Sequence, residues 1–320
     1  MIGSWLRGLA LAAVVLHGAA HAQGDAFPSK PIRFVVCCTG FPEAVARVVA
    51  EQVTEATKQQ VVVDPKPGAN GILAAEYVAK APPDGYTVLI GTNSTHAANQ
   101  SLYKQLNYDY VKDFVPLTAL SQGALMLAVN PSLPAKNVAE LTALARKDPG
   151  KLVYGYASSS TRAAMEQYKQ MAGVQIQDIP YKTLPQATTD LLGGRLDLMI
   201  GDMVSLPPHV QSGKLRALAV TGPKRMAAFP DVPTLDEAGV TGYVLTFWLG
   251  AWAPAGTPPA VVQKLNEMIV AALKSPRVTE FLVKAGSEPF PTTSAELMKF
   301  QMSEQQKWNR ILTTAGIQPE

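Results

Sequence analysis

Residues 34–43 read FVVCCTGFPE, and this stretch decides the fold class. It begins with an apolar, β-branched run typical of a buried strand and continues through a tight Gly/Pro turn. A helical pattern of apolar residues follows, at Ala44, Val45, Val48 and Val49. The stretch therefore predicts a strand, a short loop and a helix N-terminus. In open α/β sheets such a loop presents backbone N–H groups to a ligand, so we expect it to form one wall of a ligand-binding cleft.

The same alternation of strands and helices continues along the chain. Strands are predicted at residues 32–36, 60–63, 87–91, 152–156, 174–180, 196–200 and 215–220, and helices at 43–57, 72–80, 138–147, 161–172, 186–192 and 206–212. This spacing predicts mostly parallel sheets flanked by helices, an α/β fold. A strand-like run at 243–253 precedes a helical remainder at 260–274, 276–284 and 294–315. The remainder has too few strands to be a domain alone, so it must pack on an earlier unit.

Two α/β units of similar size, with a helical tail that returns to the first, predict two lobes. The chain would cross between them near residues 125–130 and again near 247–253. We expect lobe 1 to contain residues 26–126 plus 248–320, and lobe 2 to contain residues 127–247.

The composition excludes several classes of protein. Hydrophobic residues make up 47% of the 320 residues and charged residues only 17%, which argues against disorder. The formal net charge of +3 is small and spread along the chain, which argues against nucleic acid or a membrane surface as partner.

Residues 1–22 have the composition of a secretory signal peptide. Arg7 is their one charge, residues 9–16 are apolar, and Ala20-His21-Ala22 has the small-x-small form of a cleavage site. The apolar run is too short for a membrane span, and no cysteine follows the site to carry a lipid. We expect cleavage after Ala22 and an exported, soluble mature protein.

The two cysteines of the chain, Cys37 and Cys38, are adjacent. They cannot bridge distant elements, and two ligands do not make a structural zinc site. Either they form a strained vicinal disulfide in an oxidising compartment, or they are two buried thiols.

Several further stretches resemble one protein family across nearly the whole mature chain. These are FPSKPIRFVV, KPGANGILAAEYVAKAPPDGYTVLIGTNSTHAAN, LYKQLNYDYVKDF, MAGVQIQDIPYK, TTDLLGGRLDLMIGD, GKLRALAVTGPKR, PDVPTLDEAG and APAGTP. In them the chain resembles the periplasmic solute-binding proteins of tripartite tricarboxylate transporters, also called Bug-type receptors. The resemblance implies a two-lobed periplasmic binding protein fold of type II (Venus flytrap). It also implies a monomer without enzymatic activity, cofactor or metal, which captures an organic acid between its lobes and delivers it to a two-component membrane permease.

Two loops depart from the pattern of that family. The first usually reads Pro-Phe-x-Pro-Gly-Gly-x-x-Asp, whereas residues 37–43 here read CCTGFPE, with Glu43 in place of the aspartate. The second is usually rich in Gly, Asn and Ser and ends in His, whereas residues 157–162 here read ASSSTR, with Arg162 near the histidine position. Both loops are shorter than usual, so the identity of the ligand stays open.

The second loop carries candidate ligand contacts at the start of a predicted helix. One serine among Ser158, Ser159 and Ser160 would cap the helix, and the others, with Thr161, could hold a carboxylate. Arg162 opposes the helix dipole, which a bound anion would compensate. Alternatively, Arg162 bends to solvent or pairs with Glu166.

Further candidates come from other loops of the chain. Glu43 either complements the helix dipole or accepts a hydrogen bond from the ligand, and Asp202 either forms a turn or holds a water or polar ligand group. The stretch 67–71 offers Gly68 and Ala69 for close backbone approach, with Asn70 as a helix N-cap or ligand contact. The remaining candidates are Thr39, Gly40 and Thr95, with Phe41 and Phe247 as an apolar wall.

Other residues of these loops favour structural roles. We expect His96 to be a helix cap or a buried hydrogen-bonding side chain, and His209 lies too far along the chain to support a histidine metal site. Trp248 and Trp252 fit a buried interlobe core better than a stacking wall.

These observations favour a periplasmic receptor for a small organic carboxylate, either a di- or tricarboxylate or an aromatic acid. The first rival is a sensor that docks on a membrane signalling protein when loaded. A hydrolase on the same fold is the second, but no G-x-S-x-G motif occurs and the histidines offer no recognisable pairing with a nucleophile. The sequence does not distinguish among carboxylate and amide ligands, and it does not identify the permease.

Overall fold

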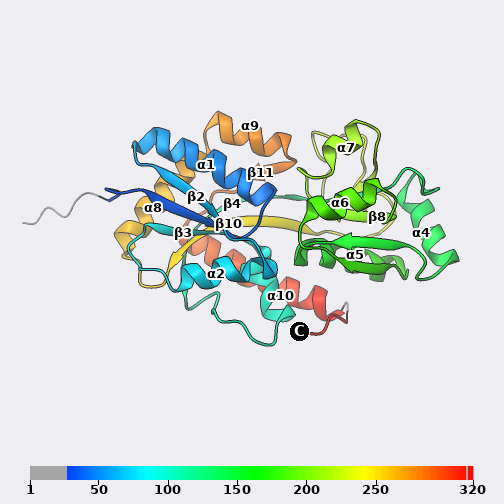
Figure 1. Cartoon of the computed structure of the whole chain (residues 1–320), viewed down its shortest axis with the longest axis horizontal. Helices are drawn as coiled ribbons and strands as arrows, with labels where there is room; N and C mark the ends of the chain where they lie inside the picture. The colour runs from blue at the N-terminus through cyan, green and yellow to red at the C-terminus, as the bar shows by residue number, and fades with distance from the viewer. Residues whose placement is uncertain (1–26, 315, 320) are drawn as a thin grey trace, which may run out of the picture.

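The computed structural model describes residues 27–314 and 316–319. The predicted signal peptide, residues 1–22, lies outside the described residues. Figure 1 shows two α/β halves side by side, one coloured blue, cyan, yellow, orange and red and the other green. Within the described part of the chain, no helix is both long enough and apolar enough to cross a membrane.

The first half is built on a six-stranded sheet with the strand order β11-β4-β10-β3-β1-β2. Its strands are β1 (Ile32–Val36), β2 (Val61–Pro65), β3 (Thr87–Thr92), β4 (Phe114–Ala124), β10 (Thr246–Pro254) and β11 (Ser287–Pro289). The helices around it are α1 (Phe41–Thr57), α2 (Ile72–Ala79), α3 (Asn99–Leu102), α8 (Pro259–Leu273), α9 (Pro276–Lys284) and α10 (Ser294–Thr314), with the short turns η1 (Ala69–Gly71) and η2 (Ser94–Ala98). In Figure 1, α1 and α9 cover one face of this sheet, and α2 and α10 cover the other.

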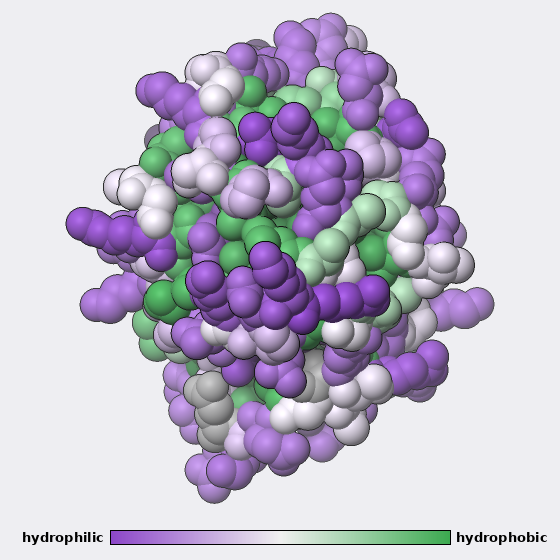
Figure 2. Space-filling model, turned by 90° about the vertical axis from the view of Figure 1, so that its right-hand side faces the viewer, coloured by the Kyte–Doolittle hydropathy of each residue, from purple (hydrophilic) through white to green (hydrophobic). Residues whose placement is uncertain are grey.

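The second half is built on a five-stranded sheet with the strand order β7-β6-β8-β5-β9. Its strands are β5 (Met126–Val129), β6 (Val153–Tyr156), β7 (Gln177–Pro180), β8 (Leu198–Gly201) and β9 (Arg216–Val220). The helices are α4 (Val138–Lys147), α5 (Ser159–Ala172), α6 (Leu184–Leu192) and α7 (Pro207–Gln211). At the end of the molecule formed by this half, hydrophilic side chains predominate and small apolar areas lie between them (Figure 2). Apolar areas scattered in this way are ordinary on a protein surface.

Both sheets are mixed, which differs from the expectation of mostly parallel sheets. β1 pairs in parallel with β2 and β3, and β6 pairs in parallel with β7 and β8. β10 and β5, in contrast, pair antiparallel with their neighbours on both sides. Parallel neighbours need a long crossover connection, usually a helix. The chain enters β5 and β10 as it passes between the two halves, without such a crossover, and these strands therefore run in the opposite direction.

The C-terminal helices pack on the first sheet, as the sequence predicted, and α10 is fixed there by a buried carboxylate. Glu304 is 6% exposed and accepts hydrogen bonds from the indole N–H groups of Trp248, at 2.9 Å, and Trp308, at 3.2 Å. One helical turn earlier, Gln301 accepts a hydrogen bond from the indole of Trp252. Trp248 and Trp252 are fully buried, in agreement with the expectation of a core role. The central strand β10 is therefore bonded to a helix more than 40 residues further along the chain.

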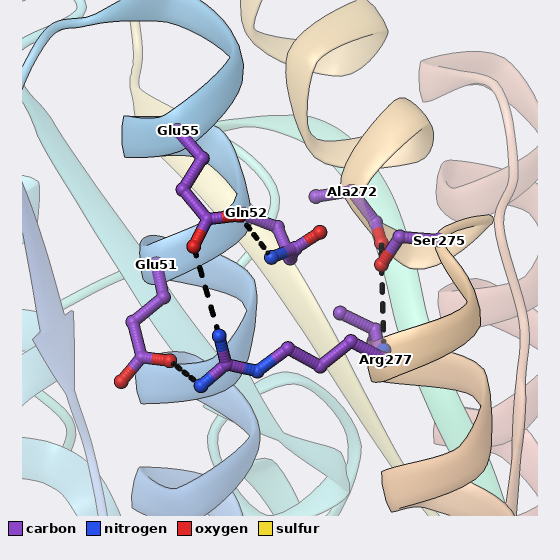
Figure 3. Close-up of polar contacts among 7 residues, drawn as sticks. Glu51, Gln52, Glu55, Ala272, Ser275 and Arg277 are labelled. Carbon is purple, nitrogen blue, oxygen red and sulfur yellow. Dashed lines mark hydrogen bonds and ion pairs between the residues drawn. The ribbon is translucent and has the colours of Figure 1, made fainter.

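A polar contact on the surface joins α9 to α1 (Figure 3). Arg277, near the start of α9, forms ion pairs with Glu51 and Glu55, which lie one turn apart on α1. More than half of each of these side chains is exposed, so the pairs contribute little stability.

Replacing Glu304 tests the attachment of α10. Glu304→Ala leaves two buried indole N–H groups without their acceptor, so we expect the free energy of unfolding to fall by about 2–4 kcal/mol, measured by urea denaturation. Lys307→Ala is the matched control, because it removes only the partly exposed cation paired with the same carboxylate. Its effect should stay below about 1 kcal/mol. Equal losses in the two variants would contradict a structural role for the indole contacts.

Candidate ligand-binding site

A cavity of about 740 Å³ lies between the two halves, and we call it the interlobe cavity. Loops that follow β1, β3, β6, β7 and β8 line it. Thirteen of the fifteen candidate residues from the sequence are among its lining: Thr39, Gly40, Phe41, Gly68, Ala69, Asn70, Ser158, Ser159, Ser160, Thr161, Arg162, Asp202 and Phe247. Carboxyl ends of strands are the usual ligand-binding edge of such sheets, so the cavity lies where the topology places a ligand.

The start of α1 forms one wall of this cavity. Gly40 is the N-cap residue with φ of 81°, and no side chain among the described residues caps the helix. The second residue, Pro42, has no N–H, and the N–H of Ala44 donates to the carbonyl of Gly40. The positive end of this 17-residue helix therefore reaches the cavity without a side-chain cap, and the one carboxylate in its first turn, Glu43, pairs with Arg47.

The start of α5 forms the opposite wall. Ser158 is its N-cap: the serine side chain accepts a hydrogen bond from the backbone N–H of Thr161, whose own hydroxyl completes a capping box. This outcome agrees with the expectation that one serine of the three is a cap. The N-termini of two helices from different sheets thus meet at one cavity.

Ser159 and Ser160 connect the two halves beside the cavity. The Ser159 hydroxyl lies 2.5 Å from the Ser94 hydroxyl, and the Asn93 amide donates to the Ser160 hydroxyl at 2.7 Å. All four residues are less than 9% exposed. Asn93 and Ser94 follow β3 in the first half, so these bonds join the rim of one sheet to the first turn of α5.

Arg162 lies over an aromatic ring at the cavity wall. Its guanidinium carbon is 5.1 Å from the ring centre of Tyr156, and its Nη2 lies 3.9 Å from a carboxylate oxygen of Asp178. A quarter of the Arg162 side chain is exposed. Glu166, which the sequence offered as a partner for Arg162, accepts a hydrogen bond from the hydroxyl of Tyr154 and pairs with Lys169.

Asp202 supplies a carboxylate at the boundary between the halves. Its Oδ1 accepts hydrogen bonds from the backbone N–H groups of Val204 and Ser205, at 3.0 and 2.7 Å, so it stabilises its own turn. Its Oδ2 faces Gly40, at 3.5 Å from where a β-carbon on that glycine would be. Asp202 is therefore both a turn residue and part of the cavity wall.

An aromatic pair closes one side of the cavity. The rings of Phe41 and Phe247 meet edge to face, with centres 5.1 Å apart. Both side chains are less than 9% exposed, so they contribute an apolar wall more than an open stacking surface.

Two candidate residues do not line the cavity. Glu43 forms an (i, i+4) ion pair with Arg47 on the outside of α1, at 2.5 Å. Thr95 is fully buried, and its hydroxyl lies 2.9 Å from Nδ1 of His96 and donates to the backbone oxygen of Thr92.

Asn70 is not a helix N-cap, which was one of the two roles that the sequence left open for it. Gly71 occupies that position with φ of 83°, and Asn70 donates its amide to the hydroxyl of Tyr103. A β-carbon at position 71 would lie 2.7 Å from Thr95 and 2.9 Å from Cys37, so glycine is required by both conformation and space.

Sequence reasoning missed several cavity residues, among them Asn93, Ser94, Tyr103, Tyr156, Tyr181 and Lys182. Five of these follow β3 or β7 or end β6, so the rule that led to Asp202 could have indicated them as well. Lys182 adds a second cation to the lining beside Arg162, against one carboxylate, Asp202. Within the described part of the chain, no cluster of three or more His, Cys, Asp or Glu residues could hold a metal ion.

The two mixed sheets, joined by crossing strands and separated by a cavity at their strand ends, define a two-lobed solute-binding protein. The sequence profile of the tripartite tricarboxylate transporter family receptor (TctC) matches residues 45–317. Because the match extends over most of the chain, the protein belongs to this receptor family. The resemblance and the two-lobed α/β fold predicted from the sequence are thereby confirmed.

Individual relatives agree with this assignment. Protein BugT of Bordetella pertussis is 32% identical over 303 residues, which cover 93% of each protein. The solved structure of Rpa4515 from R. palustris with adipate has a TM-score of 0.89 and 36% identity, and covers 92% of this chain and all of that one. The structure of MatC (Rpa3494) from Rhodopseudomonas palustris with bound malate has a TM-score of 0.82 and 28% identity, and covers 89% of this chain and all of that one.

His96 provides a pH test of the packing behind the cavity. It is fully buried, stacked on Trp252 at 3.7 Å between ring centres, and burial holds its pKa well below the usual value. Below about pH 6.5 the unfolded chain takes up a proton that the folded chain does not. The free energy of unfolding should therefore fall as the pH is lowered from 6.5, with a slope of up to about 1.4 kcal/mol per pH unit from this residue.

Denaturant titrations between pH 7 and pH 5 measure this slope. His96→Asn keeps a polar group near Thr95 but does not titrate. In this variant the free energy of unfolding should depend less steeply on pH, by the contribution of one proton. Identical pH slopes in the two proteins would contradict the assignment.

Proposed function

We propose that the protein is a periplasmic receptor that binds a small organic acid in the interlobe cavity and delivers it to a tripartite tricarboxylate-type permease. The observation that carries this proposal is the meeting of two helix N-termini, of α1 and α5, at one cavity. Each offers partial positive charge and backbone donors, and a carboxylate is the small organic group that such a site favours. The solved relatives with adipate and malate bind acids of this class.

The charges of the lining favour a diacid over a monoacid. If one carboxylate of the ligand lies at the helix starts, Lys182 is available to a second carboxylate. Lys182 is exposed and has no ion-pair partner among the described residues. Arg162 stands in the first turn of α5, where it opposes the helix dipole, and a bound anion compensates that cost. The aromatic wall of Phe41 and Phe247 suits the hydrocarbon part between the two carboxylates.

Because the ligand site lies between two lobes, ligand binding is linked to closure of the lobes. We place lobe 1 at residues 26–126 plus 248–320 and lobe 2 at residues 127–247, with export directed by residues 1–22. A ligand that contacts the starts of both α1 and α5 binds better when the lobes are together, so it shifts the protein toward the closed form. A permease can then distinguish loaded from empty receptor by the shape of the molecule.

The described residues offer little for catalysis. The serines and cysteines of the lining need a base for nucleophilic attack, and neither His96 nor His209 lines the cavity. Binding without turnover is therefore the function that these side chains support.

A thermal-shift titration of the mature protein, residues 23–320, tests the proposal. Adipate should raise the melting temperature with the logarithm of its concentration, because it binds only the folded state. The uncharged diamide of the same chain length is the control, and it should produce a much smaller shift. No shift with adipate, malate, citrate or benzoate, or turnover of any of them, would contradict the receptor assignment.

Lys182→Met tests the second carboxylate. Calorimetric titration should show adipate binding weakened roughly tenfold to a hundredfold, the effect of one charged hydrogen bond, while hexanoate binding changes by less than about threefold. Lys214→Met, an exposed lysine that does not line the cavity, is the matched control and should leave both affinities unchanged. Equal losses for adipate and hexanoate at Lys182 would refute a specific contact with a second acid group.

A further inference from the structure

The two cysteines of the chain lie in the wall of the interlobe cavity, between the end of β1 and the start of α1. Their sulfur atoms are 3.0 Å apart. No other cysteine occurs in the sequence, so the two thiols have only each other as an intramolecular partner. Neither residue takes part in the carboxylate contacts described above.

The two thiols differ in their access to solvent. Cys37 is fully buried, and its hydrogen bond with Cys38 together with burial raises its pKa well above the usual value. Cys38 is partly exposed at the cavity. A small reagent that enters the cavity therefore reaches the sulfur of Cys38 first, and the sulfur of Cys37 is already beside it.

Cys37 is also packed against a second loop of the cavity. Its backbone N–H donates to the carbonyl of Ile90, which anchors it to β3. Its β-carbon lies so close to Gly71 that a side chain on that glycine would come within 2.9 Å. A change at the cysteines therefore acts both on residues 39–43 at the start of α1 and on the loop that ends at Gly71.

We propose that Cys37 and Cys38 form a thiol–disulfide exchange site whose oxidised form is a vicinal disulfide in the cavity wall. The oxidant is a low-molecular-weight disulfide. The sulfur of Cys38, as thiolate, attacks one sulfur of that disulfide, forms a mixed disulfide and releases the first small thiol. The sulfur of Cys37 then attacks the sulfur of Cys38, closes the ring and releases the second. The protein loses two electrons and two protons, and the small disulfide takes them up as two thiols.

Closing this ring changes the ligand site. The ring contains the peptide bond between Cys37 and Cys38, so its closure reorients the backbone that leads into Thr39 and Gly40. Those residues position the start of α1, which under the proposed function contacts the carboxylate. Affinity for the acid then depends on the oxidation state of the cysteines, and this second step rests on the proposed function.

Peptide mapping of the mature protein after incubation with oxidised glutathione tests the exchange site. Trypsin cleaves after Arg33 and Arg47, so one peptide carries both cysteines. We expect this peptide to lose two hydrogen atoms, to carry no glutathione and to resist alkylation until a reductant is added. A peptide that keeps two alkylatable thiols, or one with glutathione stably attached to Cys38, would overturn the proposal.

Two single variants separate the steps. Cys37→Ser should stop the reaction at the mixed disulfide, with glutathione retained on Cys38. Cys38→Ser should stay unmodified in the folded protein and react only after denaturation, because Cys37 is buried. Glutathione on both variants at equal rates in the folded state would contradict the assigned order of attack.

Calorimetric titration with adipate tests the coupling to the ligand. Oxidation should weaken adipate binding to the unsubstituted protein roughly fivefold to tenfold, as expected for one displaced hydrogen bond, and reduction should restore it. Cys38→Ser should bind adipate equally before and after the oxidant. Equal affinity of the oxidised and reduced unsubstituted protein would refute the coupling. Absence of adipate binding in both forms would refute the proposed function, and the mapped disulfide would still establish the exchange site.

Discussion

The uncapped start of α1, facing the capped start of α5, is the constraint on which this structure depends. A helix end at a cavity leaves backbone donors that must be satisfied by a side chain, water or a ligand. At α5 the protein supplies Ser158 and Thr161, and at α1 it supplies glycine and proline, neither of which has a side-chain acceptor. This asymmetry leaves the start of α1 without a side-chain cap, whereas the start of α5 is held by its own capping box.

The surrounding packing holds both helix starts in register. β10 lies at the centre of the first sheet, where its tryptophans bond to α10, and the neighbouring β3 leads into Asn93 and Ser94. The side chains of these two residues reach the first turn of α5 through buried hydrogen bonds. The C-terminal helix, the central sheet and the cavity thus form one connected structure. Under the proposed function these serine and asparagine side chains exchange bonds with one another for bonds with water as the lobes separate, at a net cost of about 0.5–1.5 kcal/mol per hydrogen bond.

Much of the fold could be predicted from the sequence because apolar periodicity and turn residues determine local structure. The strand at residues 32–36 and the helices at 138–147 and 276–284 appear with the predicted bounds. The direction of β5 and β10 and the short strand β11 were missed. Strand direction depends on how the chain returns between lobes, a long-range property, and Ser287–Pro289 is too short to carry a periodic signal.

Residues of the candidate site that directly follow a strand could be predicted from the sequence. Residues within a helix were predicted less well, because the direction of each side chain depends on its position around the helix. Gly40 and Ser158 were found because each stands between a strand and a helix. Glu43 was included because it stands at the start of α1, in place of the aspartate usual in the family, but it pairs with Arg47 one turn further along α1 and does not line the cavity. Lys182 was missed because an exposed lysine in a loop resembles any other surface lysine. Because Lys182 belongs to the second half, only the first half on the other side makes it part of a cavity.

The most direct test of the central claim is a crystal structure of the mature protein with adipate. We expect one carboxylate to lie between the starts of α1 and α5, within hydrogen-bond distance of backbone N–H groups at both. We expect the other carboxylate to lie toward Lys182. A carboxylate that contacts neither helix start, or adipate bound outside the interlobe cavity, would contradict the proposed binding site.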